Sequence, residues 1–475
     1  MSLRLGRETL LHFLSQAGVT IAGFVASFAI ARLGGADVLG LYAVAVGIAF
    51  WLNIPATAMS NAMTKRISEG VDREAYLGTG LLIEGLLAVG LGLLVVAATP
   101  VLENYVTAPL GPLVGFLVAS NVAVVAIVAS LAGEKQVAAS GGLKTIERVL
   151  RSTLHIGLIV TGYGVSALLA GHVVAAFVAV GVGFLWLDLR IGRPTIAAAR
   201  KLLEYARFSW LSKLKTRAFG WMDTIMLAFF AVSSSLIGVY QVSWNIATIF
   251  ALVATSVQNT LFPEVSEIST GENEEQIHHL LNEGLTFTAV FIIPGLFGAL
   301  AIGRRVLLIY GPEFTQGVVV LSILVVARLL AAFGNQFLNV VNAVDRPDIA
   351  FRVNAVFVAA NLLLNVALVA AYGWQGAAVA TAVSGGVVFV LGYWSVSTVI
   401  GRPTIPWRSL AAQVGAGLCM TGVVLLCKEL LPRSHYITVF IVGLGAAVYA
   451  VTLVGFSPRV RTKAIALLPM DIDPQ

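Results

Sequence analysis

Charged and amide side chains recur at helical spacing inside strongly apolar stretches of this sequence. The segment ARLLAAFGNQFLNVVNAVDRP, residues 327–347, places Arg328, Asn335, Asn339 and Asn342 on one face of a helix, because their spacing follows the 3.6-residue turn. A guanidinium binds phosphate or carboxylate through paired hydrogen bonds, and side-chain amides bind hydroxyl groups. These residues therefore predict either hydrogen bonds between buried helices or a polar surface that binds a ligand.

Further polar side chains share helical faces in other apolar stretches, where they cannot point at lipid. For the amides, hydrogen bonds between helices are the first interpretation, whereas a buried arginine is costly unless it faces water or a partner. Arg148 and Arg151 share a face with His155, and we interpret them either as interfacial anchors or as a gate for a phosphate. The further candidates are Gln16, Asn53, Asn61, Lys213, Arg217, Asp223, Asn245 and Asn259.

Two buried carboxylic acids stand out in these stretches. Asp223 lies deeper than the cations Lys213 and Arg217 and needs a partner. Glu84 lies in the middle of an apolar run with no cation on an adjacent turn. We interpret Glu84 as a protonated or hydrogen-bonded glutamate, with a proton-coupling site as the alternative.

The composition is that of an integral membrane protein. Of the 475 residues, 58% are hydrophobic and 11% are charged, and the mean hydropathy is +0.91. A soluble globular protein has about 25% charged residues. Runs such as LLIEGLLAVGLGLLVVAA lack the alternation of barrel strands, so the membrane-crossing elements must be helices. The net charge of +6 reflects membrane topology, and no nucleic-acid binding is expected.

The elements that must position the polar faces are about 14 transmembrane helices of about 20 apolar residues each. The fifth is the least regular, because ASGGLKTIERVLRSTLHIGLIV carries its charges in the first half. Most Lys and Arg residues fall on one side of this arrangement, which places both termini in the cytoplasm. The apolar runs begin near residues 10, 38, 77, 108, 143, 164, 207, 234, 284, 315, 351, 374, 409 and 435.

An internal repeat divides the helices into two pseudo-symmetric lobes. A shift of 198 residues pairs Gly40 with Gly238, and a shift of 209 residues pairs the Tyr-Gly at 163–164 with that at 372–373. The shift covers an even number of crossings, so the lobes relate by an axis along the membrane normal. We predict an N-terminal six-helix lobe at 1–188, a cytoplasmic amphipathic linker at 189–206, a C-terminal six-helix lobe at 207–400, and helices 13 and 14 with a cytoplasmic tail at 401–475.

No motif for catalysis, a cofactor or a metal ion is evident in the sequence. It lacks the GxxxxGK[ST] loop that binds ATP phosphates, the HExxH zinc motif and the GxSxG nucleophile motif. Its six histidines have no metal-ligand spacing, and its two cysteines lie in one apolar run. We therefore expect a transporter without its own ATPase, and not an enzyme.

Four stretches resemble the polysaccharide-exporting flippases of the multidrug/oligosaccharidyl-lipid/polysaccharide exporter superfamily. They are ARLGGADVLGLYAVAVG, SSSLIGVYQVSWNIA, YGPEFTQGVVVLSILVVARLLAAFGNQFLNVVNAVDRPDI and YGWQGAAVATAVS. The resemblance covers nearly the whole chain and implies an all-α, MATE-like membrane fold of two six-helix lobes around a central cavity, followed by two C-terminal helices. It also implies that the first two helices of each lobe line the cavity. Arg328 lies outside those helices, so it either lines the cavity or organises the C-terminal lobe.

This resemblance implies a transporter that moves a lipid-linked oligosaccharide or polysaccharide repeat unit from the cytoplasmic to the external leaflet by alternating access. A polyprenyl or dolichyl phosphate carrier needs cations for its phosphate, amides for the sugar hydroxyls and an apolar seam for its tail. One alternative is a cation-coupled multidrug exporter of the same superfamily. Another, of a different class, is a membrane glycosyltransferase or oligosaccharide ligase, against which the short external loops argue.

The same reasoning sets the expected partners and location. The partners are the lipid-linked glycan and membrane lipid, with coupling to H+ or Na+ and contact with glycan-assembly enzymes left open. The expected location is a plasma or inner cell membrane.

Overall fold

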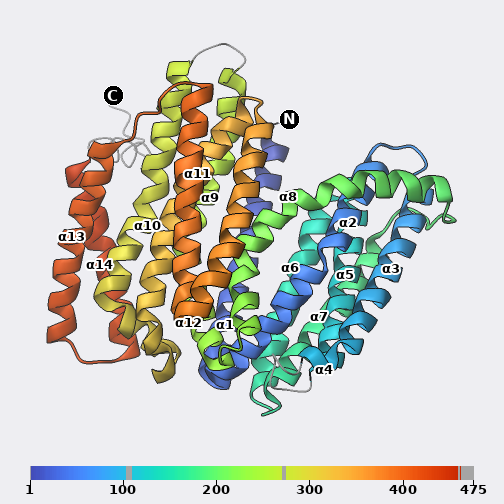
Figure 1. The fold of residues 1–475 in the computed structure, drawn as a ribbon, viewed down its shortest axis with the longest axis horizontal. Helices are drawn as coiled ribbons and strands as arrows, with labels where there is room; N and C mark the ends of the chain where they lie inside the picture. Colours follow the sequence, from blue (N-terminus) through green and yellow to red (C-terminus); the bar gives the residue numbers. More distant parts are fainter. Residues whose placement is uncertain (1, 103–109, 270–273, 458–460, 462–475) are drawn as a thin grey trace, which may run out of the picture. The chain divides into compact units, whose positions relative to one another are not determined.

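The computed structural model describes residues 2–102, 110–269, 274–457 and 461, and within these residues every regular element is a helix. The helices are drawn in Figure 1. Their bounds are α1 (Ser2–Leu52), α2 (Ile54–Ser68), α3 (Arg73–Ala97), α4 (Thr99–Leu102), α5 (Gly111–Gly133), α6 (Val137–Ile159), α7 (Gly164–Trp186), α8 (Ile196–Phe229), α9 (Ser234–Ser269), α10 (Glu274–Tyr310), η1 (Pro312–Gly317), α11 (Val318–Ala343), α12 (Pro347–Val399), α13 (Trp407–Leu430) and α14 (His435–Phe456).

Two of the longest helices are each a pair of membrane crossings joined at a glycine. Gly35 in α1 has a φ of 78° and Gly373 in α12 has a φ of 59°, a backbone region that glycine adopts without strain. Gly164, which the internal repeat pairs with Gly373, has a φ of 57° and begins α7. The same glycine turn therefore separates α6 from α7 and the two halves of α12, as the repeat predicts.

The number of membrane crossings agrees with the sequence. Among the described residues, 10 helices are long and apolar enough to cross a membrane. Division of α1 at Gly35 and of α12 at Gly373, with the addition of the more highly charged α6 and α8, gives the predicted set of about 14 crossings. The chain is a multi-pass, all-α membrane protein.

The first of two compact units comprises residues 1–241. Within it, α3 packs on α5, α5 on α7, and α6 on both α7 and α1. The core between α2, α3 and α8 includes Met63, Leu77 and Leu202, all of them fully buried. This unit contains the second half of α1, α6 and α7, which carry the polar contacts described below.

The polar segment between the sixth and seventh crossings joins this core through the start of α8. The side chain of Thr195 accepts a hydrogen bond from the backbone N–H of Ala198, which caps the first turn of α8. Leu202 is buried against α2 and α3, whereas Leu203 on the opposite face is exposed. α8 then continues without a break to Phe229, so its amphipathic start and the following crossing form one helix.

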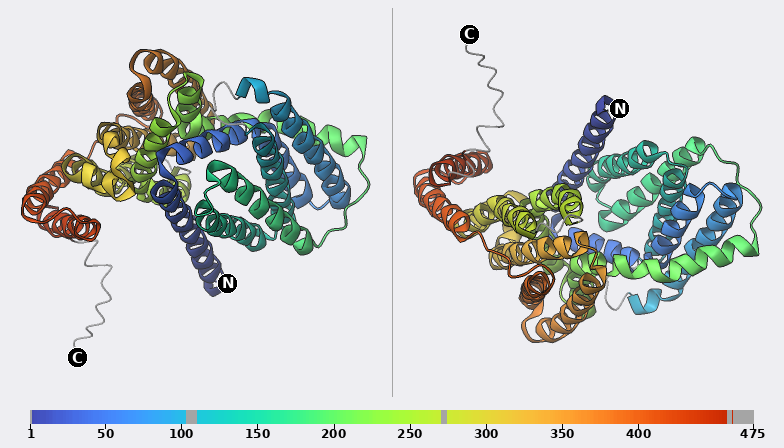
Figure 2. Two further views of the ribbon diagram at one scale, coloured as in Figure 1. Left: turned by 90° about the horizontal axis from the view of Figure 1, so that it is seen from below. Right: turned by 90° about the horizontal axis from the view of Figure 1, so that it is seen from above.

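The second unit comprises residues 242–475. Within it, α11 packs along α12 and against α10, while α13 and α14 form a pair that packs against α10 (Figure 2). Ile302, Met420 and Ile441 are buried where α10, α13 and α14 meet. The two C-terminal helices therefore have an apolar contact of their own with the rest of this unit.

Candidate functional site

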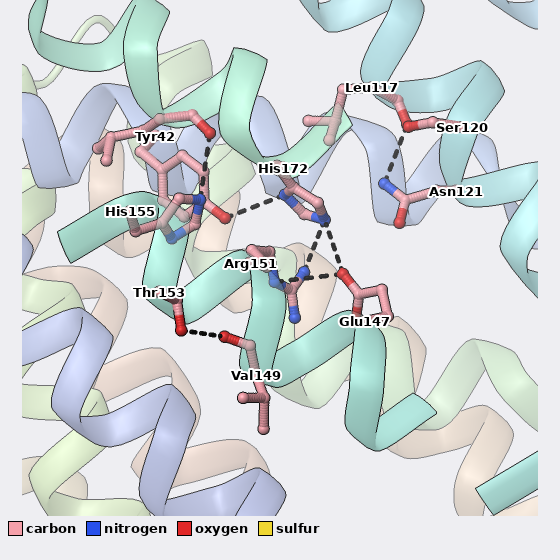
Figure 3. Close-up of polar contacts among 11 residues, drawn as sticks. Tyr42, Leu117, Ser120, Asn121, Glu147, Val149, Arg151, Thr153, His155 and His172 are labelled. Atoms are coloured by element: carbon pink, nitrogen blue, oxygen red, sulfur yellow. Dashed lines mark hydrogen bonds and ion pairs between the residues drawn. The ribbon is translucent and has the colours of Figure 1, made fainter. Parts of the chain in front are cut away.

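A chain of polar contacts connects α1, α6 and α7 inside the first unit (Figure 3). The hydroxyl oxygen of Tyr42 on α1 lies 3.0 Å from Nδ1 of His172 on α7. Nε2 of His172 lies 2.6 Å from Nη1 of Arg151 on α6, and Nε of Arg151 lies 3.4 Å from Oε1 of Glu147, one turn earlier on α6. His172 is 1% exposed and Arg151 is 9% exposed. The contacts thus cross-link three helices away from solvent.

The chemistry of Arg151 fixes the proton positions on His172. A guanidinium only donates hydrogen bonds, so Nε2 of His172 must be the acceptor. The imidazole is then neutral, with its proton on Nδ1, and this N–H donates to the hydroxyl oxygen of Tyr42. Neutral His172 leaves Arg151 as the one cation, among the described residues, that pairs directly with Glu147.

His155 supports the same cluster from the next turn of α6. Its Nε2 lies 3.1 Å from the carbonyl oxygen of Leu168 on α7, and because a carbonyl only accepts, Nε2 carries a proton and donates. The His155 ring meets the ring of Tyr42 edge-on, with centroids 5.0 Å apart. His155 therefore holds α6 against α7 and fixes the orientation of Tyr42.

Arg148 is the cation of this cluster that has no hydrogen bond or ion pair with a described residue. No hydrogen bond or ion pair joins it to another of the described residues, whereas Arg151 is held by Glu147 and His172. Its guanidinium lies beside the first half of α1, where a Cβ placed on Gly23 would be 3.6 Å from Cζ of Arg148. The two arginines and the single glutamate leave one positive charge in excess inside an apolar bundle, where charge is costly without an anion or water.

Arg328 makes its contacts within the second unit. Its Nη2 donates a hydrogen bond to the hydroxyl of Thr248 on α9, and its guanidinium stacks over the ring of Trp244, with Cζ 4.0 Å from the ring centroid. Such a cation–π contact stabilises by about 0.5–2 kcal/mol. Arg328 therefore ties α11 to α9.

Arg217 and Asp223, at the start of the second predicted lobe, also contact other side chains. Arg217 on α8 stacks over the ring of Phe50 on α1, with Cζ 4.4 Å from the ring centroid. Asp223 is buried and accepts a hydrogen bond from the hydroxyl of Tyr240 on α9. A tyrosine hydroxyl is thus one partner of Asp223. The side chain of Lys213 lies outside the described residues.

The amide candidates lie in different environments. Asn53 is buried at the break between α1 and α2, and Asn61 is half-buried on α2. Asn245 is half-buried and Asn259 exposed on α9. The side chain of Gln16 lies outside the described residues.

Three members of the buried cluster were not among the sequence candidates: Tyr42, Glu147 and His172. The four-residue spacing of Glu147 and Arg151 could have indicated their ion pair. Tyr42 and His172 gave no comparable signal, because each is a single polar residue in an apolar run and their contact is 130 residues apart along the chain.

Comparison with known proteins shows which family this chain belongs to. A profile described as polysaccharide biosynthesis protein matches residues 82–319. The chain is 30% identical over 472 residues to the probable flippase AglR of Haloferax volcanii, covering 98% of each chain. The chain belongs to the polysaccharide biosynthesis protein family. The predicted resemblance to polysaccharide flippases is thereby confirmed, and this family member is a transporter and not an enzyme.

Other relatives agree with this family membership. The chain is 27% identical over 456 residues to the probable low-salt glycan biosynthesis flippase Agl15 of the same organism, covering 93% of this chain and 94% of the relative. In fold, it matches the lipid II flippase MurJ in an inward closed conformation with a TM-score of 0.80, at 15% identity, covering 96% of this chain and 100% of that chain. It matches an inward-facing multidrug resistance MATE transporter less closely, with a TM-score of 0.58 at 16% identity, covering 82% of this chain and 94% of that chain. Both likenesses concern the fold alone.

Proposed function

We propose that this protein flips a lipid-linked glycan, carried on a polyprenyl or dolichyl phosphate, from the cytoplasmic to the external leaflet by alternating access. The observation that carries the proposal is Arg148, a cation in an apolar bundle that no described carboxylate neutralises. A hydrogen bond between a guanidinium and a phosphate is charge-assisted and about twice as strong as a neutral one. An anionic group passing through the membrane would balance the excess charge on α6.

The environment of Arg148 fits a phosphate and its attached sugar. By helical spacing, Gly23 lies on the same face of α1 as Gln16, seven residues earlier. The absence of a side chain at Gly23 leaves room for the guanidinium of Arg148 beside α1. We therefore propose that Arg148 contacts the phosphate, that Gln16 and the amides of α2 and α9 contact sugar hydroxyls, and that Arg151 holds Arg148 in place through the turn of α6 they share.

An apolar cavity in the second unit supports a lipid-linked substrate. It has a volume of about 420 Å³ and lies between α9, α10, α13 and α14. Its walls include Phe250, Phe291, Pro294, Met420 and Ile441. An isoprenoid tail remains in an apolar environment in such a cavity, while the phosphate and the glycan are handled by polar residues elsewhere.

The other cations are proposed to have different roles. Arg328 organises the C-terminal lobe, because it contacts Thr248 and Trp244 on α9 of the same unit. Arg217 and Lys213 remain candidates for contact with the substrate at the start of the lobe predicted at 207–400. The Lys and Arg distribution favours cytoplasmic termini in a plasma or inner cell membrane.

The decisive experiment measures the orientation of lipid-linked glycan in membrane vesicles from a deletion strain. Complementation uses wild type, Arg148→Ala, Arg148→Lys and, as a matched control, Arg346→Ala. Arg346 is an exposed arginine of the second unit that ion-pairs with Asp348. We expect wild type and Arg346→Ala to restore external glycan, and Arg148→Ala to lower its rate of appearance about tenfold or more, since a charged hydrogen bond contributes about 1.5–3 kcal/mol.

The remaining outcomes separate the parts of the proposal. Arg148→Lys keeps the cation but not the paired donors, so it should retain part of the activity. If deletion leaves glycan orientation unchanged, flipping of this substrate class is refuted, and drug export becomes the next activity to test. If Arg148→Ala behaves like Arg346→Ala at equal protein levels, the phosphate contact at Arg148 is refuted while the flipping activity stands.

A further inference from the structure

Glu84 is a buried carboxyl group that the proposed contacts with the substrate do not use. It lies in the middle of α3 and is 2% exposed. The hydroxyl of Ser60 on α2 donates a hydrogen bond to its Oε1 at 2.7 Å. Its Oε2 is buried and has no hydrogen-bond partner among the described residues. The carboxyl group therefore accepts one hydrogen bond, from a hydroxyl, among the described residues.

No cation compensates Glu84 from the elements that pack on α3, which are α2, α4, α5 and α8. α4 and α5 contain no charged or titratable residue. Lys65 and Arg66 on α2 both pair with Glu69 at the end of that helix. None of the charged or titratable groups on these helices or on α3 itself forms a described ion pair with Glu84. Besides Lys65 and Arg66, these groups on α3 and α8 are Arg73, Glu74, Tyr76, Arg200, Lys201, Glu204, Tyr205, Arg207, Lys213, Lys215, Arg217 and Asp223.

This environment fits a neutral carboxylic acid far better than a carboxylate. Burial of an ionised carboxylate without a counter-charge is so costly that the group binds a proton instead. In the neutral acid, Oε1 is the carbonyl oxygen that accepts from Ser60 and Oε2 carries the proton. A carboxylate at the same place would need further donors, which the present packing of α2 against α3 does not supply.

The helix that carries Ser60 follows α1 across a local break in the helix. α2 is separated from α1 at Asn53, whose φ of −81° and ψ of 7° end the first helix. The side-chain oxygen of Asn53 is itself buried without a hydrogen-bond partner among the described residues. α2 also carries Asn61, one of the candidate contacts of the substrate. A change in the charge of Glu84 would therefore act on a short helix that belongs to the predicted cavity wall.

We propose that Glu84 and Ser60 form a proton-binding site, and that uptake and release of a proton there moves α2 against α3 during transport. In each cycle the carboxylate takes one proton from water to become the neutral acid, and later returns that proton to water. The ligand of this site is H+, and no other co-reactant is needed. The coupling to transport rests on the proposed flipping activity, whereas the proton-binding site does not.

The first test is an infrared titration of the purified full-length protein in lipid. Wild type should show at neutral pH the carbonyl-stretching band of a protonated carboxylic acid, and the contribution of Glu84 to this band should be lost in Glu84→Gln. Ser60→Ala should shift the band, because the carbonyl oxygen loses its donor. Glu204→Gln, which changes an exposed glutamate, serves as the control and should keep the band. A band that is the same in wild type and Glu84→Gln overturns the proposal.

The second test measures flipping in vesicles under an imposed pH gradient. Wild type and Glu204→Gln should respond to the gradient, whereas Glu84→Gln, which stays neutral at every pH, should lose the response. A response that survives in Glu84→Gln overturns the coupling. If Glu84→Gln neither flips glycan nor responds to the gradient, the infrared titration alone tests the proton-binding site, since that measurement needs no substrate. The infrared result also holds if wild type fails to flip glycan, so failure of the proposed function can be told apart from failure of this inference.

Discussion

Gly40 on α1 and Gly238 at the start of α9 contact each other's helix reciprocally within the first unit. A Cβ on Gly40 would overlap the carbonyl oxygen of Ser234 and lie 2.9 Å from the backbone nitrogen of Gly238. A Cβ on Gly238 would overlap the carbonyl oxygen of Ala36 and lie 3.1 Å from the Cα of Ala36. The internal repeat pairs Gly40 with Gly238 and also Ala36 with Ser234. Within the first unit, α1 and the start of α9 therefore meet through residues that the repeat pairs, with the Ser234 hydroxyl donating to Asp37 beside them.

Substitution of Gly40 or Gly238 by alanine should destabilise the protein, because the added methyl group meets backbone atoms that cannot move independently. Overpacking of this kind costs about 1–3 kcal/mol. Gly157→Ala is the matched control, since a Cβ there meets open space and alanine favours a helix by about 1 kcal/mol. The midpoint of thermal unfolding in detergent should fall for the first two variants and not for the control. Equal midpoints for all three would refute the close contact.

Arg148 and Arg151 should differ in their effects on stability, although they lie on adjacent turns of one helix. Arg151→Ala leaves Glu147 and the acceptor nitrogen of His172 without their donor, and breaking a buried pair costs about 3–5 kcal/mol. Arg148→Ala removes an unpaired cation, so the unfolding midpoint should stay the same or rise. Thermal unfolding of both variants measures this difference. A larger loss for Arg148→Ala would mean that Arg148 has a structural partner.

Arg328→Ala should lower the stability of the second unit and leave the affinity for lipid-linked glycan unchanged. The variant loses the stacking on Trp244, which contributes about 0.5–2 kcal/mol, and the hydrogen bond to Thr248. Arg304→Ala, at an exposed arginine of α10, is the control. Thermal unfolding and binding of lipid-linked glycan are measured in parallel. Normal stability with lost binding would instead assign Arg328 to the cavity.

A surface ion pair gives a prediction for the pH dependence. The Arg66 guanidinium donates a hydrogen bond to Glu69, with Nη1 and Oε2 3.0 Å apart, and this bond lowers the pKa of the Glu69 carboxyl. Because the pKa is lower in the folded state, the pair stabilises the protein above the unfolded-state pKa and stops doing so as the pH falls through the folded-state pKa. Arg66→Gln should return the pKa of Glu69 toward the usual value of about 4.3.

The measurement for Glu69 is a carboxyl NMR titration of selectively labelled protein. Arg346→Gln, which removes a different surface ion pair, should leave the Glu69 titration unchanged. An unchanged Glu69 pKa in Arg66→Gln would show that the hydrogen bond does not persist in solution.

The sequence alone was sufficient to predict the features that depend on a single helix or a single turn. Membrane crossings follow from apolar length, because a helix that satisfies its own backbone needs no distant partner in lipid. The Tyr-Gly pairs of the repeat placed the same glycine turn before α7 and inside α12, where Gly164 and Gly373 have nearly equal φ angles. The position of the polar faces likewise follows from helical spacing alone.

The roles of the individual polar residues were decided only by the tertiary structure. Arg148 and Arg151 have the same side chain and lie three residues apart, so the sequence predicted the same role for both. They differ because His172, from α7, contacts Arg151 and is itself hydrogen-bonded to Tyr42 of α1, whereas no described hydrogen bond joins His172 to Arg148. In the same way, the contacts of Arg328 with Trp244 and Thr248 depend on the packing of α11 beside α9. Hydrogen bonds and ring contacts act over only a few ångströms, so a residue's role depends on which distant helix packs beside it, and the composition and spacing of its own helix do not contain that information.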